Sequence, residues 1–280
     1  MHAGDFTTHV TRDEAAPQAV APLPVAVRTW AQFERHVHRS GRPLLARLDA
    51  FADSVLVAGC QRSGTTALSR LITSTAGMVD FQVGHDDELD AALILSGAVE
   101  HRPAGRYCFQ TTYLNDHWHE YLEHDDYRLL WVLRNPASVV LSMLTNWRRA
   151  ALRRLFRHTG AARLDAAGLR CYRRFGTLGV PRLRMACLSY TAKTAQVLEL
   201  HRRLPAGRLL VLDYDRLVVE RATQLPQVYA FIGAQWCDDF GAALHAGSLA
   251  KADRFHEQHR ALLDTECMPV YEEARTLALR

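Results

Sequence analysis

Three short apolar runs, each followed directly by polar residues, dominate the pattern of the chain. They are SVLVA at 54–58, RLLWVL at 128–133 and RLLVLDY at 208–214. Unbroken apolar runs of this length are typical of strands that are buried on both faces of a parallel sheet. Residues 106–110 (RYCFQ) are a fourth candidate strand.

Outside these runs, the spacing of apolar residues predicts helices. One or two helices are expected within residues 28–50, before the first strand. The others are expected at 64–75, 113–124, 136–149, 182–203, 215–232 and 255–278. Pro136 suits the first turn of the helix at 136–149.

The alternation of strands and helices predicts an α/β fold with three layers, in which a central parallel β-sheet is flanked by helices. We expect it to be of the P-loop nucleotide-binding type, with a single domain at residues 28–280 and a flexible leader at 1–27. Ligands of such sheets bind beyond the carboxyl ends of the strands. The chemistry is therefore expected in the loops at 59–66, 134–142 and 213–217.

The composition is that of an ordinary globular domain, with 48% hydrophobic residues, 23% charged residues and a net charge of +4. No segment reaches the roughly 18 consecutive apolar residues that span a bilayer, and the N-terminus does not have the pattern of a signal peptide. The six cysteines show no metal-ligand spacing. We expect a cytoplasmic protein without membrane insertion.

Arginine is the dominant cation, since only Lys193 and Lys251 among the 34 basic residues are lysines. Such a bias is typical of a GC-rich bacterial genome, so arginine content alone does not indicate phosphate binding. The densest cluster, within 148–163, is interpreted as a solvated helix face, with a lid over the site as the alternative. It lacks interleaved aromatic residues, and no nucleic-acid partner is expected.

The loop after the first strand has the form of an anion-binding loop. Gly59 and Gly64 have the spacing G-x-x-x-x-G between a strand and a helix. Such a loop binds a tetrahedral anion through backbone N–H groups and the positive N-terminus of the helix. Further donors lie in the same loop: Arg62, Ser63, Thr65 and Thr66.

Two substitutions distinguish this loop from that of a nucleotide hydrolase. Thr65 stands where the hydrolase carries its lysine, and the strand at 128–133 ends in Arg134 rather than in an aspartate that would complete a magnesium site. The loop therefore suits an anion whose transfer needs no metal, such as a sulfuryl group.

Three blocks of sequence resemble the sulfotransferases that use 3′-phosphoadenosine 5′-phosphosulfate (PAPS). GCQRSGTT at 59–66 resembles their 5′-phosphosulfate loop, and RNPASVVLSML at 134–144 resembles their 3′-phosphate motif. In the second block Arg134 and Ser142 are eight residues apart, so both side chains can face one anion. LLVLDYDRL at 209–217 resembles a third block, in which Tyr214 would lie beside the adenine.

The resemblance implies PAPS as the sulfuryl donor, adenosine 3′,5′-bisphosphate (PAP) as the product, and no required metal. It implies that the nucleotide is bound by Arg62, Ser63, Gly64, Thr65, Thr66, Arg134, Ser142 and Tyr214. Arg62 would also assist the leaving phosphate. The stretch RFHEQHRALLDTECMPVYEEA at 254–274 resembles the closing helix of the bacterial and tyrosylprotein-type branch.

The catalytic base is less well defined, because a fourth family block is altered at 109–112. Gln110 replaces a lysine there, and Thr112 replaces the histidine that is the base in one branch of the family. The other branch uses a carboxylate some twenty residues beyond the loop. VGHDDELD at 83–90 offers Asp86 as the first choice, with His85, Asp87 and Glu88 as rivals and an acidic helix cap as the non-catalytic interpretation.

The sequence therefore predicts an enzyme that moves a sulfuryl group from PAPS to a hydroxyl or amine of an acceptor by in-line displacement. The acceptor is expected to be a small molecule or natural product from bacterial secondary metabolism, and whether two copies form a homodimer stays open. One alternative is a P-loop kinase or nucleotide hydrolase, which Thr65 disfavours. The other is a catalytically inactive PAP-binding relative, which Gln110 and Thr112 favour.

Overall fold

The computed structural model describes residues 27–74, 77–81, 86–237, 255 and 257–279. Of the predicted leader, only Val27 lies within this part of the chain, and its side chain is buried in the core. The single domain predicted for residues 28–280 stays a prediction.

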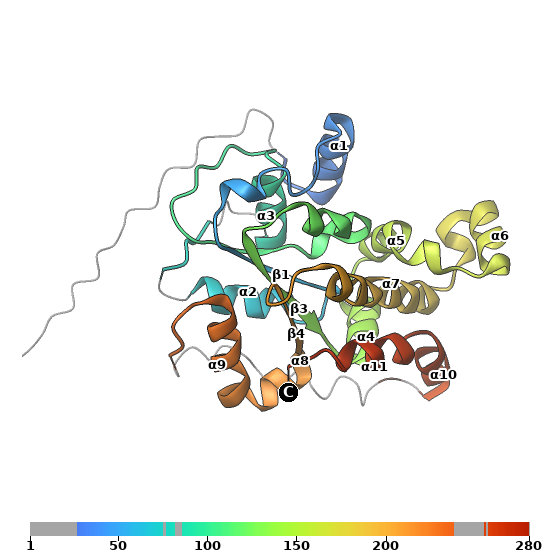
Figure 1. Ribbon diagram of the computed structural model, residues 1–280. Coiled ribbons are helices and arrows are strands. Elements are labelled where there is room, and N and C mark those ends of the chain that lie inside the picture. The colour runs from blue at the N-terminus through green and yellow to red at the C-terminus, as the bar shows by residue number, and fades with distance from the viewer. Residues whose placement is uncertain (1–26, 75–76, 82–85, 238–254, 256, 280) are drawn as a thin grey trace, which may run out of the picture.

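Four parallel strands form one sheet in the order β2-β1-β3-β4. They are β1 (Ser54–Gly59), β2 (Cys108–Gln110), β3 (Tyr127–Leu133) and β4 (Leu209–Asp213). The register places Val57 opposite both Gln110 and Leu130, so the carboxyl ends of the strands lie at one edge of the sheet (Figure 1). The three strands predicted from the apolar runs are confirmed, and so is the candidate strand at 106–110, of which Cys108–Gln110 is strand.

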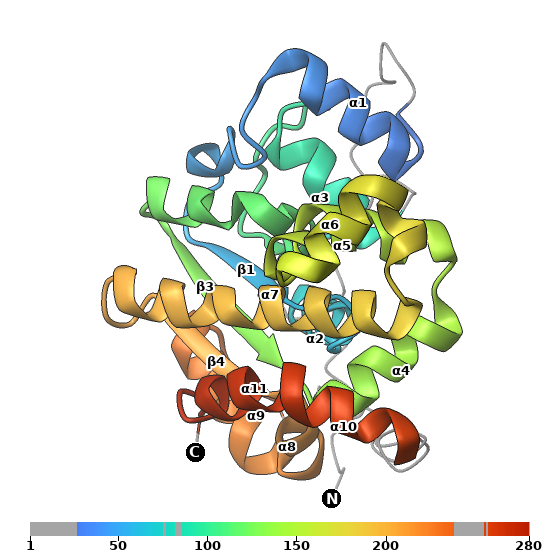
Figure 2. The same ribbon diagram turned by 90° about the vertical axis from the view of Figure 1, so that its right-hand side faces the viewer.

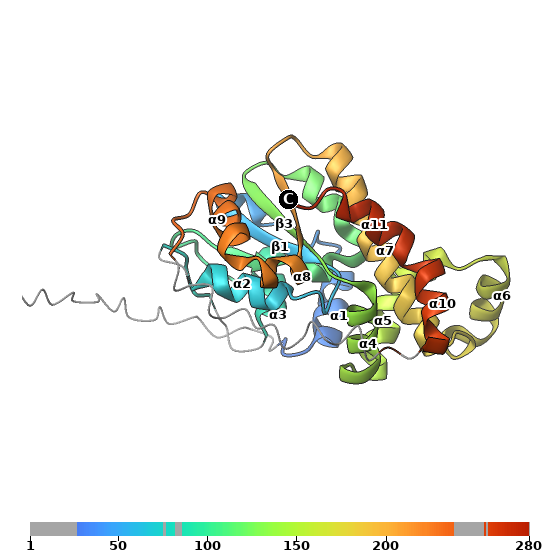
Figure 3. The ribbon, with the colours of Figure 1, turned by 90° about the horizontal axis from the view of Figure 1, so that it is seen from below.

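Helices cover both faces of the sheet, which confirms the predicted three-layer α/β class (Figure 3). One face packs against α2 (Thr65–Thr73), α8 (Tyr214–Val219) and α9 (Arg221–Ile232). The other packs against α4 (Pro136–Asn146), α7 (Arg182–Arg203) and α11 (Met268–Arg275). The buried strand residues alternate between these two cores, as the pleat requires.

The remaining helices surround the second face. Figure 2 shows α7 running across the front of the sheet, with α11 beside it. The other α-helices are α1 (Trp30–Ser40), α3 (Asp87–Leu95), α5 (Arg149–His158), α6 (Ala166–Phe175) and α10 (Glu257–Glu266). Short 3₁₀ segments are η1 (Leu48–Ala50), η2 (Thr112–Glu123), η3 (Gly160–Arg163) and η4 (Gly176–Gly179).

Four predicted helices differ from the observed elements. The helices expected at 215–232 and 255–278 are each divided in two, at Glu220 into α8 and α9 and at Cys267 into α10 and α11. The helix expected at 113–124 is a series of 3₁₀ turns, broken at Asn115 by a φ of 46° that an α-helix cannot contain. The helix expected at 136–149 ends at Asn146, because the backbone is extended at Trp147 before α5 begins. Arg182 donates hydrogen bonds to the carbonyl oxygens of Met143 and Trp147 at this break.

Candidate active site

The loop between β1 and α2 approaches its neighbours so closely that two glycines are required. A Cβ atom on Gly59 would lie 2.5 Å from the carbonyl oxygen of Val132, and one on Gly64 would lie 2.3 Å from the ring of Tyr214. Their φ angles, 143° and 101°, are also ones that other residues rarely adopt. These contacts fix the loop against the ends of β3 and β4.

Inside the loop, the donors have the geometry of an anion site. Arg62 has a φ of 76°, a strained value for a residue with a side chain. The hydroxyl of Ser63 is buried and has no hydrogen-bond partner among the described residues. Thr65 accepts a hydrogen bond from the Gln110 amide at 3.1 Å, so Gln110 fixes this hydroxyl from β2.

The structure brings together the three side chains that the sequence assigned to the two ends of the nucleotide. Arg62 Nε donates to Ser142 Oγ at 3.0 Å, and Arg134 Nη1 donates to the carbonyl oxygen of Arg62 at 3.4 Å. Burial, and then repulsion by Arg134, lowers the pKa of Arg62. Two guanidinium groups held this close favour an anion between them.

Arg134 is held in place on three sides at the end of β3. Its Nε lies 3.3 Å from Oδ1 of Asp215, and its guanidinium carbon lies 5.0 Å from the centre of the Tyr214 ring. The hydroxyl of Tyr190, on α7, donates to the carbonyl oxygen of Arg134 at 2.8 Å. Only 5% of Arg134 is exposed, so its direction is fixed before any ligand binds.

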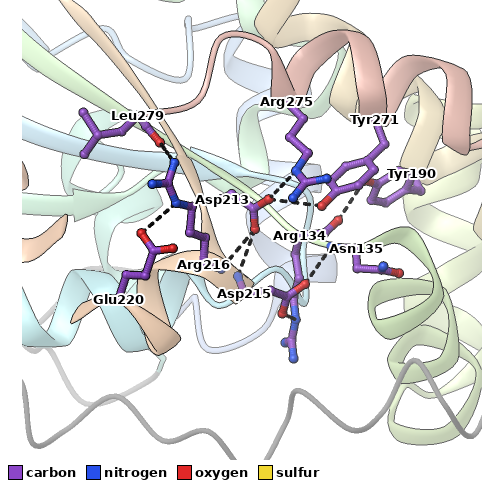
Figure 4. A network of polar contacts seen from close by, with 10 residues as sticks. All are labelled: Arg134, Asn135, Tyr190, Asp213, Asp215, Arg216, Glu220, Tyr271, Arg275 and Leu279. Carbon is purple, nitrogen blue, oxygen red and sulfur yellow. Dashed lines mark hydrogen bonds and ion pairs between the residues drawn. The ribbon is translucent and has the colours of Figure 1, made fainter. Parts of the chain in front are cut away.

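Asp213 joins the end of β4 to the last helix, as Figure 4 shows. Its carboxylate accepts hydrogen bonds from Tyr271 at 3.2 Å and Arg275 at 3.1 Å, both on α11. Its other oxygen caps α8 by accepting from the backbone of Asp215 and Arg216. The same network therefore supports Asp215, which in turn contacts Arg134 and accepts from the backbone N–H of Asn135 (Figure 4).

Tyr214 lies closer to the loop than the sequence implied. Its ring packs between Gly64 and Arg134 and is 5% exposed. The contact with adenine that the resemblance implied stays a prediction, while the observed contacts make Tyr214 a support for both the glycine loop and Arg134.

The acidic run after the loop begins helix α3. Asp86 is the N-cap of this helix, and its carboxylate accepts a hydrogen bond from the backbone N–H of Leu89 at 2.6 Å. Asp87 points to Arg70 on α2, with which it forms an ion pair at 2.5 Å. His85 lies outside the described residues.

Glu88 differs from the other acids in its surroundings. The hydroxyl of Thr112 donates a hydrogen bond to Glu88 Oε1. Burial raises the pKa of Glu88 to about 7, the Thr112 hydrogen bond opposes this rise, and Asp86 adds to it. A carboxyl group that titrates near neutral pH is suited to accept a proton in catalysis.

A cavity of about 740 Å³ opens between α1, η2 and α5, with Asp86 and Glu88 in its wall. Much of its lining is apolar and aromatic, with Trp30, Phe33, Val37, Leu44, Tyr113, Trp147 and Leu155. The Tyr113 hydroxyl is buried and has no hydrogen-bond partner among the described residues. The cavity is large enough for a small organic molecule.

Two residues of the site were not identified from the sequence. Gln61 donates from the loop to Thr112 O at 3.0 Å and to Asn115 Oδ1 at 3.1 Å. Lys193 donates from α7 to the same Thr112 carbonyl at 3.1 Å and is 2% exposed. The available signal for Lys193 was that a lysine interrupts the arginine bias on a long, mostly buried helix.

Most arginines of the arginine-rich stretch are exposed, as expected for a solvated helix face, namely Arg148, Arg149, Arg157 and Arg163. Arg153 and Arg154 are partly buried. Of these two, Arg154 lines the cavity and pairs with Glu34 of α1 at 2.9 Å. None of the described helices has the length and apolar character needed to cross a bilayer.

The fold is that of a P-loop-type α/β protein, with the glycine loop at the carboxyl edge of its sheet. A family model described as "Sulfotransferase domain" matches residues 52–240, more than half of the chain. The chain therefore belongs to the sulfotransferase family, and this membership supports its classification as a transferase. A comparison with curated protein sequences gave no match.

Solved structures of low sequence identity resemble this chain. Sulfotransferase STF9 from Mycobacterium avium is 12% identical with a TM-score of 0.48, and the alignment covers 86% of this chain and 80% of that one. A sulfotransferase domain from the curacin biosynthetic pathway is 12% identical with a TM-score of 0.46, covering 79% and 95%. Mouse sulfotransferase SULT7A1 complexed with PAP is 16% identical with a TM-score of 0.45, covering 84% and 91%.

Proposed function

We propose that this protein transfers a sulfuryl group from PAPS to a hydroxyl or amine of a small-molecule acceptor and releases PAP. The observation that carries the proposal is the convergence of Arg62, Arg134 and Ser142 beside a glycine loop. A nucleotide with phosphates on both ends needs two anion sites at a short separation. The loop with the N-terminus of α2 would supply one, and Arg134 with Ser142 would supply the other.

The residues present fit such a nucleotide. The buried Ser63 hydroxyl can donate a hydrogen bond to a ligand. Gly59 and Gly64 have no side chains, so the loop backbone is uncovered at those two positions. Burial, and then repulsion by Arg134, lowers the pKa of Arg62, and an anion between the two guanidinium groups would offset both effects. We propose Tyr214 as part of the same set, through its contacts with Gly64 and Arg134.

PAPS would supply the sulfuryl group, whose bond to the bridging phosphate oxygen breaks as the acceptor attacks sulfur in line. The protein's part is to hold both phosphate ends, to stabilise the charge on the leaving oxygen and to remove the proton of the acceptor. We assign the second role to Arg62 and the hydroxyls of Thr65 and Thr66. Arg62 would have to exchange its contact with Ser142 for one with the donor. The transfer is proposed to need no metal.

Among the acids that the sequence left open, we propose Glu88 as the base and Asp86 as the rival. Both side chains line the cavity, but Asp86 already caps α3, whereas Glu88 has a pKa of about 7, raised mainly by burial. The acceptor is proposed to lie in the 740 Å³ cavity, whose aromatic wall suits an apolar molecule and whose polar groups suit a hydroxyl or amine.

Two isosteric variants separate these acids. Glu88→Gln is expected to lower kcat by about 10²-fold or more, the range for removal of a general base, while PAP affinity stays within about twofold of wild type. Asp86→Asn retains a capping side chain of similar strength and is expected to leave kcat largely intact. Single-turnover transfer from labelled PAPS and calorimetric titration with PAP measure the two effects. Loss of turnover in Asp86→Asn with full activity in Glu88→Gln would reverse the assignment.

A further inference from the structure

Lys193 is a buried cation that the proposed chemistry does not use. It lies on α7, 2% exposed, and its Nζ is 5.9 Å from the centre of the Trp131 ring. Its one hydrogen bond among the described residues is to the carbonyl oxygen of Thr112, a neutral acceptor. Burial of an ammonium group costs free energy unless an anion lies near it, so an anionic side chain is expected close to Lys193.

Burial lowers the pKa of Lys193 to about 8, and three ionisable neighbours oppose this shift, namely Cys60, Glu88 and Asp116. Burial raises the pKa of Cys60 to about 12, so its thiol is neutral at physiological pH. Asp116 already faces His158, at 3.5 Å, and its side chain is half exposed. Glu88 is therefore the carboxyl group on which the charge of Lys193 acts most directly.

Thr112 connects the two groups through its two oxygens. Its carbonyl oxygen accepts from Lys193 Nζ at 3.1 Å and from Gln61 Nε2 at 3.0 Å, while its hydroxyl donates to Glu88. Residues from α7, from the anion-binding loop and from α3 thus meet at one residue of η2. A displacement of Lys193 would be transmitted to the position of the Glu88 carboxyl group.

We propose that Lys193 is a positioning residue for Glu88, which fixes the carboxyl group in the cavity wall through Thr112 and favours its ionised form by charge. The inference rests on the proposed role of Glu88 as the base. The block that contains Thr112 carries Gln110 at the place where the related block has a lysine. In this chain α7 brings a cation to the same region from a different element.

The groups that face Glu88 determine in which direction loss of the Lys193 charge shifts the pKa of Glu88. Burial and Asp86 on α3 raise the pKa of Glu88, whereas the Thr112 hydrogen bond and Lys193 lower it. Tyr113 and Tyr121, on η2, also lie near Glu88, and burial raises the pKa of each well above physiological pH, so both stay neutral. Removal of the Lys193 charge must therefore raise the pKa of Glu88 further.

The first experiment measures the protonation of Glu88 directly and does not require enzymatic activity. The infrared band of a protonated carboxyl group that is present in wild type and absent in Glu88→Gln is followed against pH in the protein without nucleotide. In Lys193→Met we expect the midpoint of this pH titration to rise by about one pH unit or more. In Lys193→Arg we expect the midpoint to stay near that of wild type. Lys193→Gln keeps a donor for Thr112 and loses the charge, so it provides a second test if the Met variant does not fold.

Ser189→Ala is the matched control for the integrity of α7. Ser189 lies one turn before Lys193, is fully buried, and donates only within the helix, to Met185 O at 2.7 Å. We expect its Glu88 midpoint to equal that of wild type. A midpoint unchanged in both Lys193→Met and Lys193→Gln, or shifted equally in Ser189→Ala, would overturn the proposal.

The second experiment is a double-mutant cycle on turnover. Lys193→Met is expected to reduce kcat at neutral pH at least tenfold and to move the acid limb of its pH profile upward, with PAP affinity unchanged. In a Glu88→Gln background the same change is expected to have little further effect. Additive losses would show that Lys193 acts apart from Glu88. Failure of wild type to bind PAP would instead refute the proposed function, while the infrared titration would still decide the link between Lys193 and Glu88.

Discussion

At the scale of single residues, the site depends on side chains whose directions are set before ligand binds. Arg134 is almost fully buried and contacts Asp215, Tyr214 and the backbone of the loop. Such pre-organisation lowers the cost of binding a charged ligand, because little side-chain freedom is lost when the ligand arrives. Arg134 is therefore expected to discriminate between nucleotides that do and do not carry a 3′-phosphate.

Arg134→Ala tests this assignment. Hydrogen bonds to charged groups contribute about 1.5–3 kcal/mol, so PAP affinity is expected to fall about 10- to 100-fold. Affinity for adenosine 5′-phosphate, which lacks the 3′-phosphate, should fall much less. Calorimetric titration with both nucleotides measures the difference.

Arg216→Ala is the matched control for this variant. Arg216 also follows the end of a strand, but it pairs with Glu220 at 2.8 Å and donates to Leu279 O (Figure 4). Its loss should leave both affinities unchanged. Equal losses for the two nucleotides in Arg134→Ala would contradict the role of Arg134 at the 3′-phosphate.

At the scale of elements, ionic contacts beside the cavity join α5 to α1 and to η2. Glu34 on α1 pairs with Arg154 on α5 at 2.9 Å, and His158 on α5 pairs with Asp116 on η2 at 3.5 Å. The hydrogen bond that His158 donates to Asp116 raises the pKa of His158. Although burial opposes it, the hydrogen bond from His158 lowers the pKa of Asp116.

These directions predict how stability depends on pH. A histidine whose pKa is higher in the folded state contributes stability that is fully present below its unfolded value of about 6.5 and is lost as pH rises through the folded value. Wild type should therefore melt at a higher temperature than His158→Gln near pH 5.5, and the difference should shrink by pH 9. Melting curves at several pH values measure this. A difference that grows toward alkaline pH would contradict the pairing.

The elements also show what sequence could and could not predict. The strands and α7 were predicted nearly to their ends, because unbroken apolar runs and a sustained helical pattern depend on local residues. Helix α5 was not assigned, since Leu152, Leu155 and Phe156 are its buried residues in a run of arginines. The break at Asn115 could not be foreseen, because its backbone conformation is held by Gln61 and Gln196 from other elements.

The same contrast between local sequence and tertiary packing decides which residues of the site could be predicted. Arg62, Arg134 and Ser142 could be identified because each stands in a local motif at a strand end or on the helix that follows it. Glu88 could only be grouped with three neighbours, since its burial and its contact with Thr112 arise from packing. Lys193 could not be placed, because nothing in its local sequence indicates that α7 passes behind Thr112.

At the scale of the whole molecule, the parallel sheet brings residues that are far apart in the sequence together at its carboxyl edge. The loop after β1, the turn after β3 and the turn after β4 meet there, and α11 supports them through Asp213. Acceptor and donor would then enter from different sides, the acceptor through the cavity under α1 and the donor over the strand ends.

We propose that this edge of the sheet binds a nucleotide with phosphates at both its 3′ and 5′ positions, and that this binding needs no metal. Calorimetric titration of the wild-type chain with PAP, with and without a chelator, tests it most directly. We predict saturable binding, at least about tenfold tighter than that of adenosine 5′-phosphate, with the same affinity in chelator. Equal affinity for the two nucleotides, or binding that disappears with the chelator, would contradict the account.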